Sequence, residues 1–143
     1  MNKLAIVYWS GTGNTETMAN CIAEGAEEAG AEVELMGPSA FSAARFSEFG
    51  AVAFGCPAMG SEVLEEAEFE PMFSGLESAL GGKRLALFGS YGWGDGQWMR
   101  DWCARCEAAN ATLYDEEGLT INDAPDEAGR ETCRELGRTL AAW

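Results

Sequence analysis

The chain begins with a short apolar segment that runs directly into a loop of glycine and hydroxyl residues, and this junction constrains its fold more than any other feature. Residues 4–9 are apolar or aromatic, and residues 10–15 combine two glycines with serine, threonine and asparagine. An apolar run of this kind, followed by glycines and a helical pattern, predicts a strand, a tight loop and a helix start. The first backbone N–H groups of a helix lack an intrahelical partner and carry partial positive charge. The junction therefore predicts a phosphate site at residues 10–15.

The loop differs from three other classes of phosphate-binding loop. A nucleotide-hydrolysing P-loop contains a lysine, whereas residues 10–15 contain neither Lys nor Arg. A dinucleotide-binding loop has a third glycine where this chain has Glu16. A phosphatase loop needs a cysteine nucleophile, which is also missing. The loop is predicted to hold a phosphate as a handle by hydrogen bonds alone; the alternative is an ordinary capped helix start.

Length and charge limit the class of protein. A chain of 143 residues with 47% hydrophobic content suits one domain over residues 1–143. The formal charge of −15 argues against nucleic acid and anionic membranes as partners. It favours a basic protein partner, or serves solubility alone. The apolar run at 4–9 is too short for a signal-peptide core or a spanning helix, so we expect a cytoplasmic protein.

The residue types exclude several kinds of catalytic site. The chain has no histidine, which removes Ser–His and Cys–His catalysis and histidine metal sites. Five cysteines, an odd number, do not suggest a disulfide framework. Cys103 and Cys106 have redox-motif spacing but lie on the apolar face inside a predicted helix, so they are interpreted as core. The remaining thiols have the same interpretation, although Cys56 lies near the predicted ligand and could be exposed.

Strand and helix patterns alternate along the whole chain. Strands are predicted at residues 4–9, 32–36, 51–55 and 85–90, and as an interrupted pair at 112–114 and 119–122. A helix is expected after each strand. Three of the helices carry apolar stripes, formed by Thr15, Met18, Ile22, Ala26 and Ala29, by Met99, Trp102, Cys103, Cys106 and Ala109, and by Cys133, Leu136 and Leu140. This alternation predicts an α/β fold with a parallel sheet covered on both faces.

Ligands of such sheets bind beyond the carboxyl ends of the strands, which directs attention to two further loops. Residues 56–62 follow the third strand and residues 90–96 follow the fourth, and both are rich in glycine. Each loop carries one large polarizable side chain, Met59 or Trp93, where a core role is not expected. A planar ring with a phosphate tail would fit between them. Considered by itself, Met59 or Trp93 would be interpreted as an ordinary surface or core residue.

The three loops together resemble the flavin loops of short-chain flavodoxins, most closely those of anaerobic bacteria. The resemblance covers essentially the whole chain in order and spacing. It implies a doubly wound, five-stranded parallel sheet of order 2-1-3-4-5, with FMN bound non-covalently near strands one and three. The residues implied to bind FMN are Ser10, Gly11, Thr12, Gly13, Asn14, Thr15, Ala58, Met59, Gly60, Ser61, Glu62, Ser90, Tyr91, Gly92, Trp93, Gly94, Asp95 and Asn122.

The resemblance also implies a role for each loop. Residues 10–15 would bind the phosphate, with help from Ser90. Met59 and Trp93 would cover the two faces of the flavin ring, and backbone N–H groups of the third loop would meet its pyrimidine edge. Glu62 would accept a hydrogen bond from N3–H. The remaining implied contacts are the Gly60 carbonyl turning toward a protonated N5 and Asn122 touching the ribityl chain or ring edge.

Two details of the second loop carry expectations of their own. With the Gly60 carbonyl directed at a protonated N5, the turn is expected to be type II-like, which would require positive φ at Ser61. Pro57 stands where some relatives have a serine that contacts the phosphate, so that contact is missing. Apolar cover and nearby carboxylates, among them Glu62 and Glu65, are expected to make the second electron hard to add.

The function implied by the resemblance is that of a low-potential one-electron carrier. It would shuttle between flavin semiquinone and hydroquinone and substitute for ferredoxin, and it would not be an enzyme. The expected partners are redox proteins with basic surfaces, such as ferredoxin-linked oxidoreductases, and the chain is expected to be a monomer. Two alternatives stay open: a flavoprotein dedicated to one partner enzyme, and an NAD(P)H-linked flavin reductase. A phosphorylation-driven receiver would need an aspartate where Gly55 and Cys56 stand.

Overall fold

The protein is described by a computed structural model that covers residues 3–11 and 13–143. In this part of the chain, six parallel strands form one sheet of order β2-β1-β3-β4-β5, and β6 continues the pairing with β4 beyond β5. The strands are β1 (Lys3–Tyr8), β2 (Glu32–Met36), β3 (Ala51–Gly55), β4 (Arg84–Tyr91), β5 (Thr112–Leu113) and β6 (Leu119–Asn122). The predicted fold class and strand order are confirmed, and the interrupted pair at the end of the chain forms β5 and β6.

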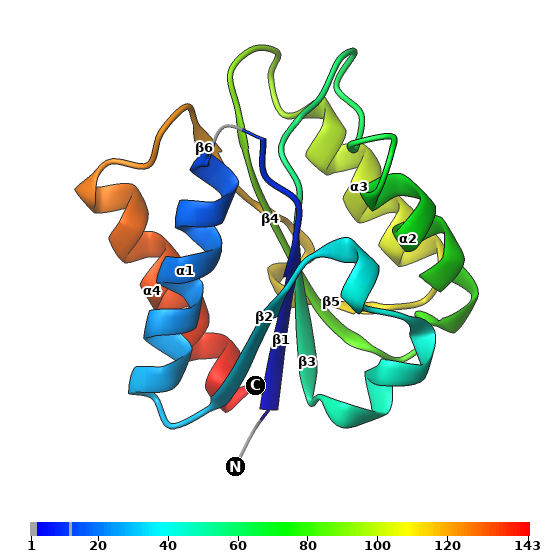
Figure 1. Ribbon diagram of the computed structural model, residues 1–143, viewed down its shortest axis with the longest axis vertical. Coiled ribbons are helices and arrows are strands. Elements are labelled where there is room, and N and C mark those ends of the chain that lie inside the picture. Colours follow the sequence, from blue (N-terminus) through cyan, green and yellow to red (C-terminus); the bar gives the residue numbers. More distant parts are fainter. Residues whose placement is uncertain (1–2, 12) are drawn as a thin grey trace.

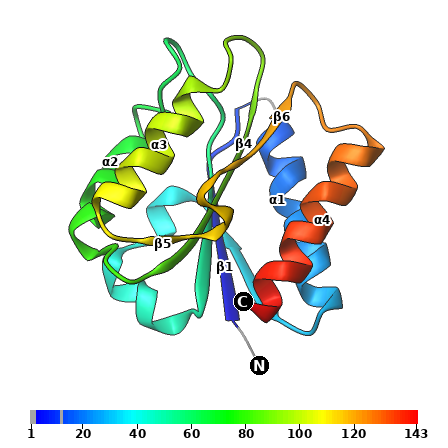
Figure 2. The same cartoon turned by 180° about the vertical axis from the view of Figure 1, so that it is seen from behind.

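Four α-helices among the described residues cover the two faces of the sheet (Figure 1). They are α1 (Asn14–Glu28), α2 (Phe69–Leu76), α3 (Gln97–Ala108) and α4 (Glu127–Ala142). Helices α1 and α4 lie on one face, and α2 and α3 lie on the other, as the view from behind also shows (Figure 2).

Strand β1 illustrates why both faces need a cover. Leu4 and Ile6 belong to the apolar core beneath α1 and α4, whereas Ala5 and Val7 belong to the core beneath α2 and α3. Successive side chains of a strand point to opposite faces, so a continuous apolar run is stable only when both faces are buried. The apolar run at the start of the chain therefore produces a central strand.

The expectation of a helix after every strand is wrong at one place. Two short 3-10 segments, η1 (Pro38–Ala40) and η2 (Ala43–Glu48), connect β2 to β3. Phe41 and Phe46 are buried there, and their rings meet edge to face 5.1 Å apart. Pro38 fixes a tight start, and apolar residues spaced in this way do not form one helical stripe. The connection is therefore a compact loop anchored by aromatic rings.

The loops that follow β1, β3, β4 and β6 lie together at the carboxyl end of the sheet (Figure 1). The helices run back from this end toward the amino end, so every parallel strand delivers its following loop to the same place. Within the described ranges, none of the helices has the length and apolar character needed to cross a bilayer.

Candidate functional site

The Ser10 hydroxyl braces the described part of the loop after β1. Ser10 Oγ accepts hydrogen bonds from the backbone N–H groups of Gly13 and Glu16, each at 3.2 Å. Gly13 is the N-cap of α1, with φ of 97°, which only glycine adopts readily, and it brings no capping side chain. The loop thus presents the open start of α1, whose first residue is Asn14. Thr12, also predicted to contact the phosphate, lies outside the described residues.

Two of the predicted phosphate ligands meet directly beneath this loop. The hydroxyl oxygens of Thr15 and Ser90 lie 3.2 Å apart, and Thr15 Oγ1 also accepts the Ser90 N–H at 3.4 Å. The side chains join the first turn of α1 to the end of β4, and both residues are buried. This contact fixes the loop against the sheet, while binding of a phosphate by either hydroxyl stays a prediction.

The loop after β3 forms a small hairpin. Met59 and Val63 exchange two backbone hydrogen bonds of 2.9 Å, which leaves residues 60–62 as its tip. Positive φ occurs at Gly60 (50°) and Glu62 (57°) and not at Ser61. The positive φ expected at Ser61 belongs to the turn with its carbonyl directed at a protonated flavin N5, so it stays a prediction. The closing pair makes a three-residue hairpin loop, whose last residue is left-handed, in place of a type II turn. Gly60 and Glu62 are therefore the residues of this turn with positive φ.

Glu62 links this hairpin to the loop after β4. Its carboxylate accepts hydrogen bonds from the N–H groups of Asp95, at 3.2 Å, and Trp98, at 3.3 Å. Trp98 lies in the first turn of α3, which has no capping side chain of its own. A carboxylate is favourable there because of the free N–H groups and the helix dipole. Gly94 makes the approach possible, because a Cβ there would lie 1.6 Å from Glu62 Oε1.

The two residues predicted to cover a planar ligand stand on these linked loops. Trp93 is 55% exposed, and its indole N–H donates a hydrogen bond of 3.1 Å to the Gly60 carbonyl. Met59 is half-buried at the base of the hairpin, next to Ala58, whose N–H donates to the Ser90 carbonyl at 3.1 Å. The structure therefore brings the loops after β3 and β4 together at their tips and at their bases.

The third predicted contact region lies where β6 ends beside β4. The Tyr91 carbonyl accepts hydrogen bonds from the Asn122 side-chain amide, at 3.2 Å, and from the Asp123 N–H, at 2.8 Å. Asp123 also lies near Gly92, where a Cβ would be 3.5 Å from its carboxylate. Asn122 is therefore adjacent to the loop after β4, as its predicted role requires.

Cys56 differs from the expectation that it could be exposed. It is fully buried, its Sγ accepts the Glu65 N–H at 3.4 Å, and burial raises the pKa of the thiol to about 12. A buried, protonated thiol is not a nucleophile. Cys103 and Cys106 are buried as well, and burial also raises the pKa of Cys106 to about 12. The thiols therefore contribute to packing.

Glu65 has a structural role that the sequence analysis missed. Its carboxylate is buried and accepts three backbone N–H groups at the start of α2, from Ala67, Glu68 and Phe69, at 2.8, 2.8 and 2.9 Å. Burial opposes ionisation, but the three hydrogen bonds outweigh it and lower the pKa of Glu65. The sequence feature that could have predicted this cap is an acidic residue shortly before an apolar helical stretch. Glu65 is thus a helix cap rather than a solvated charge beside the site.

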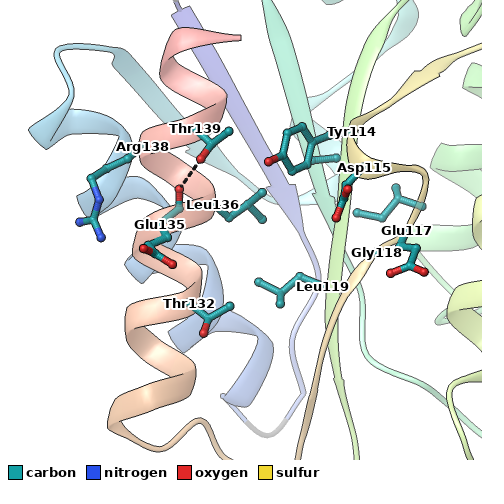
Figure 3. A pocket seen from close by; sticks show the side chains of 12 residues that line it. Tyr114, Asp115, Glu117, Gly118, Leu119, Thr132, Glu135, Leu136, Arg138 and Thr139 are labelled. Atoms are coloured by element: carbon teal, nitrogen blue, oxygen red, sulfur yellow. Dashed lines mark hydrogen bonds between the residues drawn. The ribbon is translucent and has the colours of Figure 1, made fainter.

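A separate pocket of about 510 Å³ opens between α4 and the segment that joins β5 to β6 (Figure 3). Tyr114 and Leu119 line one side, and Leu136 faces them from α4. The Thr139 hydroxyl donates to the Glu135 carbonyl at 2.9 Å, within the helix itself. None of the residues predicted to bind a ligand lines this pocket, so it is distinct from the cluster of predicted site loops at the carboxyl end of the sheet.

Comparison with known proteins gives concordant results. The family description "Flavodoxin" matches residues 6–137. A flavodoxin of Clostridium beijerinckii is 45% identical over 138 residues, which cover 96% of this chain and 99% of that protein. A flavodoxin of Megasphaera elsdenii is 46% identical over 136 residues, which cover 95% of this chain and 96% of that protein. The solution structure of two-electron reduced Megasphaera elsdenii flavodoxin superposes with a TM-score of 0.88 at 44% identity, covering 98% of this chain and 99% of that one.

Proposed function

The chain belongs to the flavodoxin family, and from this premise we propose that it carries single electrons on FMN held without a covalent bond by the loops after β1, β3 and β4. It is an electron-transfer flavoprotein rather than an enzyme. The bound flavin supplies the redox chemistry, because it accepts and releases one electron at a time. The residues of the chain bind the cofactor and set its potentials.

The observation that carries this proposal is the convergence of three loops at one end of the sheet. The open start of α1 adjoins Ser90, and the loop that begins after Ser90 is bonded to the hairpin after β3 through Glu62 and Trp93. The helix start that we propose to hold the phosphate and the two side chains that we propose to cover the ring therefore lie on loops that contact one another. This supports FMN as the ligand, because FMN has both a phosphate and a planar ring.

The residues at the start of α1 fit a phosphate. As the first residues of the helix, Asn14 and Thr15 have backbone N–H groups without an intrahelical acceptor. The Ser10 hydroxyl accepts two hydrogen bonds and keeps its own proton to donate. We assign the phosphate to this helix start, held by hydrogen bonds without a cation from the loop.

The residues of the other two loops fit an aromatic ring. Trp93 offers an exposed indole face and Met59 a half-buried thioether, both of which pack well on aromatic planes. Glu62 keeps acceptor capacity beyond its two backbone contacts, since a carboxylate has about four lone-pair sites. We assign the ring to the space between Met59 and Trp93, with its N3–H directed to Glu62.

The charge of the chain supports a particular kind of partner. Several arginines each form ion pairs with two or more carboxylates, so the negative charges around each one outnumber its single positive charge. These arginines are Arg45, Arg105, Arg134 and Arg138. Complementary charge steers association. We propose that the chain exchanges electrons with oxidoreductases that present basic surfaces, including ferredoxin-linked ones, and that it acts as a cytoplasmic monomer.

The phosphate assignment is tested by titrating the apoprotein with FMN and with riboflavin. Loss of three hydrogen bonds worth about 1 kcal/mol each should weaken riboflavin binding by at least about 100-fold. Ser10→Ala should weaken FMN binding and leave riboflavin affinity nearly unchanged. Equal affinities for the two flavins would exclude the phosphate site at α1. Steady oxidation of NAD(P)H by the isolated, FMN-loaded protein would favour the reductase alternative.

A further inference from the structure

The loop after β4 is fixed at its base to the hairpin after β3. Glu62 binds the N–H groups of Asp95 and Trp98, and Gly94 packs against the same carboxylate. The segment that carries Trp93 is therefore anchored on its far side, at the start of α3. On the near side, the Tyr91 carbonyl accepts the Asp123 N–H at 2.8 Å. Because the segment is held on both sides, the indole is presented to the hairpin in a defined place.

The hairpin after β3 is equally constrained, but only at its base. The double hydrogen bond between Met59 and Val63 closes it, and Gly60 has φ of 50°. Glycine tolerates both signs of φ, so the peptide after Gly60 changes its orientation at little conformational cost. The Gly60 carbonyl can therefore turn on a fixed base, and a hydrogen bond to it sets its direction.

Trp93 supplies that bond. Its Nε1 lies 3.1 Å from the Gly60 carbonyl oxygen, although more than half of the side chain is exposed. An indole N–H needs no partner when it faces water, so stacking alone does not account for this contact. A carbonyl oxygen has two lone pairs, so one stays free for a donor on the edge of a bound ring.

We propose that Trp93 is a positioning residue, whose indole N–H holds the Gly60 carbonyl toward the ring site while its aromatic face covers the ring. The inference rests on the proposed function, in which a flavin lies between Met59 and Trp93. The aromatic ring and the indole N–H of Trp93 then have separate roles. The ring supplies affinity, and the N–H prepares an acceptor that gains importance when the flavin edge becomes a hydrogen-bond donor.

Two substitutions separate these roles. Trp93→Phe keeps an aromatic face and removes the donor, and benzothienylalanine at position 93 keeps the indole shape and also removes the donor. Trp143→Phe is the matched control, since Trp143 packs on Tyr114 away from the loops. Flavin-free protein labelled with ¹³C gives a direct readout, because loss of a hydrogen bond moves a carbonyl resonance upfield.

We expect the Gly60 carbonyl resonance to move upfield in both Trp93 variants and to stay in place in Trp143→Phe. In the FMN-loaded protein, the equilibrium constant for the first one-electron reduction should be about fivefold smaller in both Trp93 variants. This corresponds to a midpoint potential lower by about 40 mV. An unmoved Gly60 resonance, an unchanged potential, or a fall in Trp93→Phe that benzothienylalanine restores would each overturn the inference. Failure of FMN to bind the parent protein would instead contradict the proposed function, and the Gly60 resonance would still report the bond.

Discussion

Two glutamates three positions apart show how much a single carboxylate depends on its surroundings. Glu62 reaches the start of α3 from another loop, and Glu65 closes the start of α2 within its own segment. Both supply negative charge where a helix has unpaired N–H groups. Glu62 stays partly exposed, whereas Glu65 is buried. Of the two, Glu62 is therefore the one with acceptor capacity left for the proposed flavin contact.

Glu65→Gln should lower the free energy of unfolding by about 2 kcal/mol at pH 7, because charge-assisted bonds to three N–H groups become weaker or are lost. Urea denaturation of the apoprotein measures this change. Glu66→Gln, at the exposed neighbouring position, is the control and should stay within about 0.5 kcal/mol of the parent. Equal stability of the two variants would mean that the cap contributes nothing.

The same cap predicts a dependence on pH. Because folding lowers the pKa of Glu65 below its ordinary value of 4.5, its stabilisation is fully present above that value. The stabilisation is lost as pH falls through the pKa of the folded state, when the carboxylate takes up a proton. The difference in stability between the parent and Glu65→Gln should therefore shrink as pH is lowered from 7 toward and below 4.5. A difference that stays constant over this range would assign the effect to packing.

At the scale of elements, the contact between α1 and α4 depends on two glycines. A Cβ on Gly137 would lie 1.9 Å from the Ile22 carbonyl oxygen, and one on Gly25 would lie 1.9 Å from the Arg134 carbonyl oxygen. The helices thus touch backbone to backbone at these two positions. Arg134 and Arg138 reinforce the contact through ion pairs to Glu24 and Glu28 of α1.

Gly137→Ala should destabilise the protein by about 2 kcal/mol, because the added methyl group forces the two helices apart. Gly75→Ala in α2 is the matched control, since a Cβ there has nothing within 4 Å. Removing a helical glycine from an open position should stabilise by up to about 1 kcal/mol. Thermal unfolding of both variants measures the contrast. Gly137→Ala as stable as Gly75→Ala would show that the helices do not need this close approach.

At the scale of the whole molecule, 24 acidic side chains outnumber 9 basic ones. The arginines of α4 mainly tie it to α1 and to neighbouring acids of the same helix, so they do little to offset the negative field near the loops. Two exposed acids adjoin the proposed site: Asp123 lies near Gly92 of the loop after β4, and Glu66 closely follows the hairpin after β3 in the chain. The field of the molecule therefore favours approach of a basic partner at the flavin end.

Neutralising charge at the two ends should have unequal effects. Glu66→Gln combined with Asp123→Asn removes two charges near the site, and Glu27→Gln combined with Glu107→Gln removes two at the far ends of α1 and α3. We expect the first pair to slow electron transfer to a basic oxidoreductase severalfold at low salt, and the second pair to change it much less. Stopped-flow rates should converge near about 0.5 M salt, where charges are screened. Equal slowing by both pairs would show that net charge alone matters.

The sequence by itself determined the strand positions, the fold class and the loops of the site. The central strands β1, β3 and β4 contain short apolar runs, whereas β2 and β6 alternate polar and apolar residues. Both patterns are local and predict strands without knowledge of the packed arrangement. The loops at 10–15, 56–62 and 90–96 were found because their unusual residues adjoin strand ends. In a parallel sheet, all such ends lie at one edge, so their meeting followed from topology.

The tertiary structure alone decided which partner each side chain takes. Thr15 binds Ser90, Trp93 binds Gly60, Glu65 caps α2 and Cys56 is buried, and each contact joins groups whose relative direction depends on packing. The turn at residues 60–62 and the 3-10 connection after β2 were also set this way, because a closing pair and buried rings override local preference. Sequence patterns specify which backbone elements form, whereas hydrogen-bond partners depend on distances of a few ångströms that only the packed chain establishes.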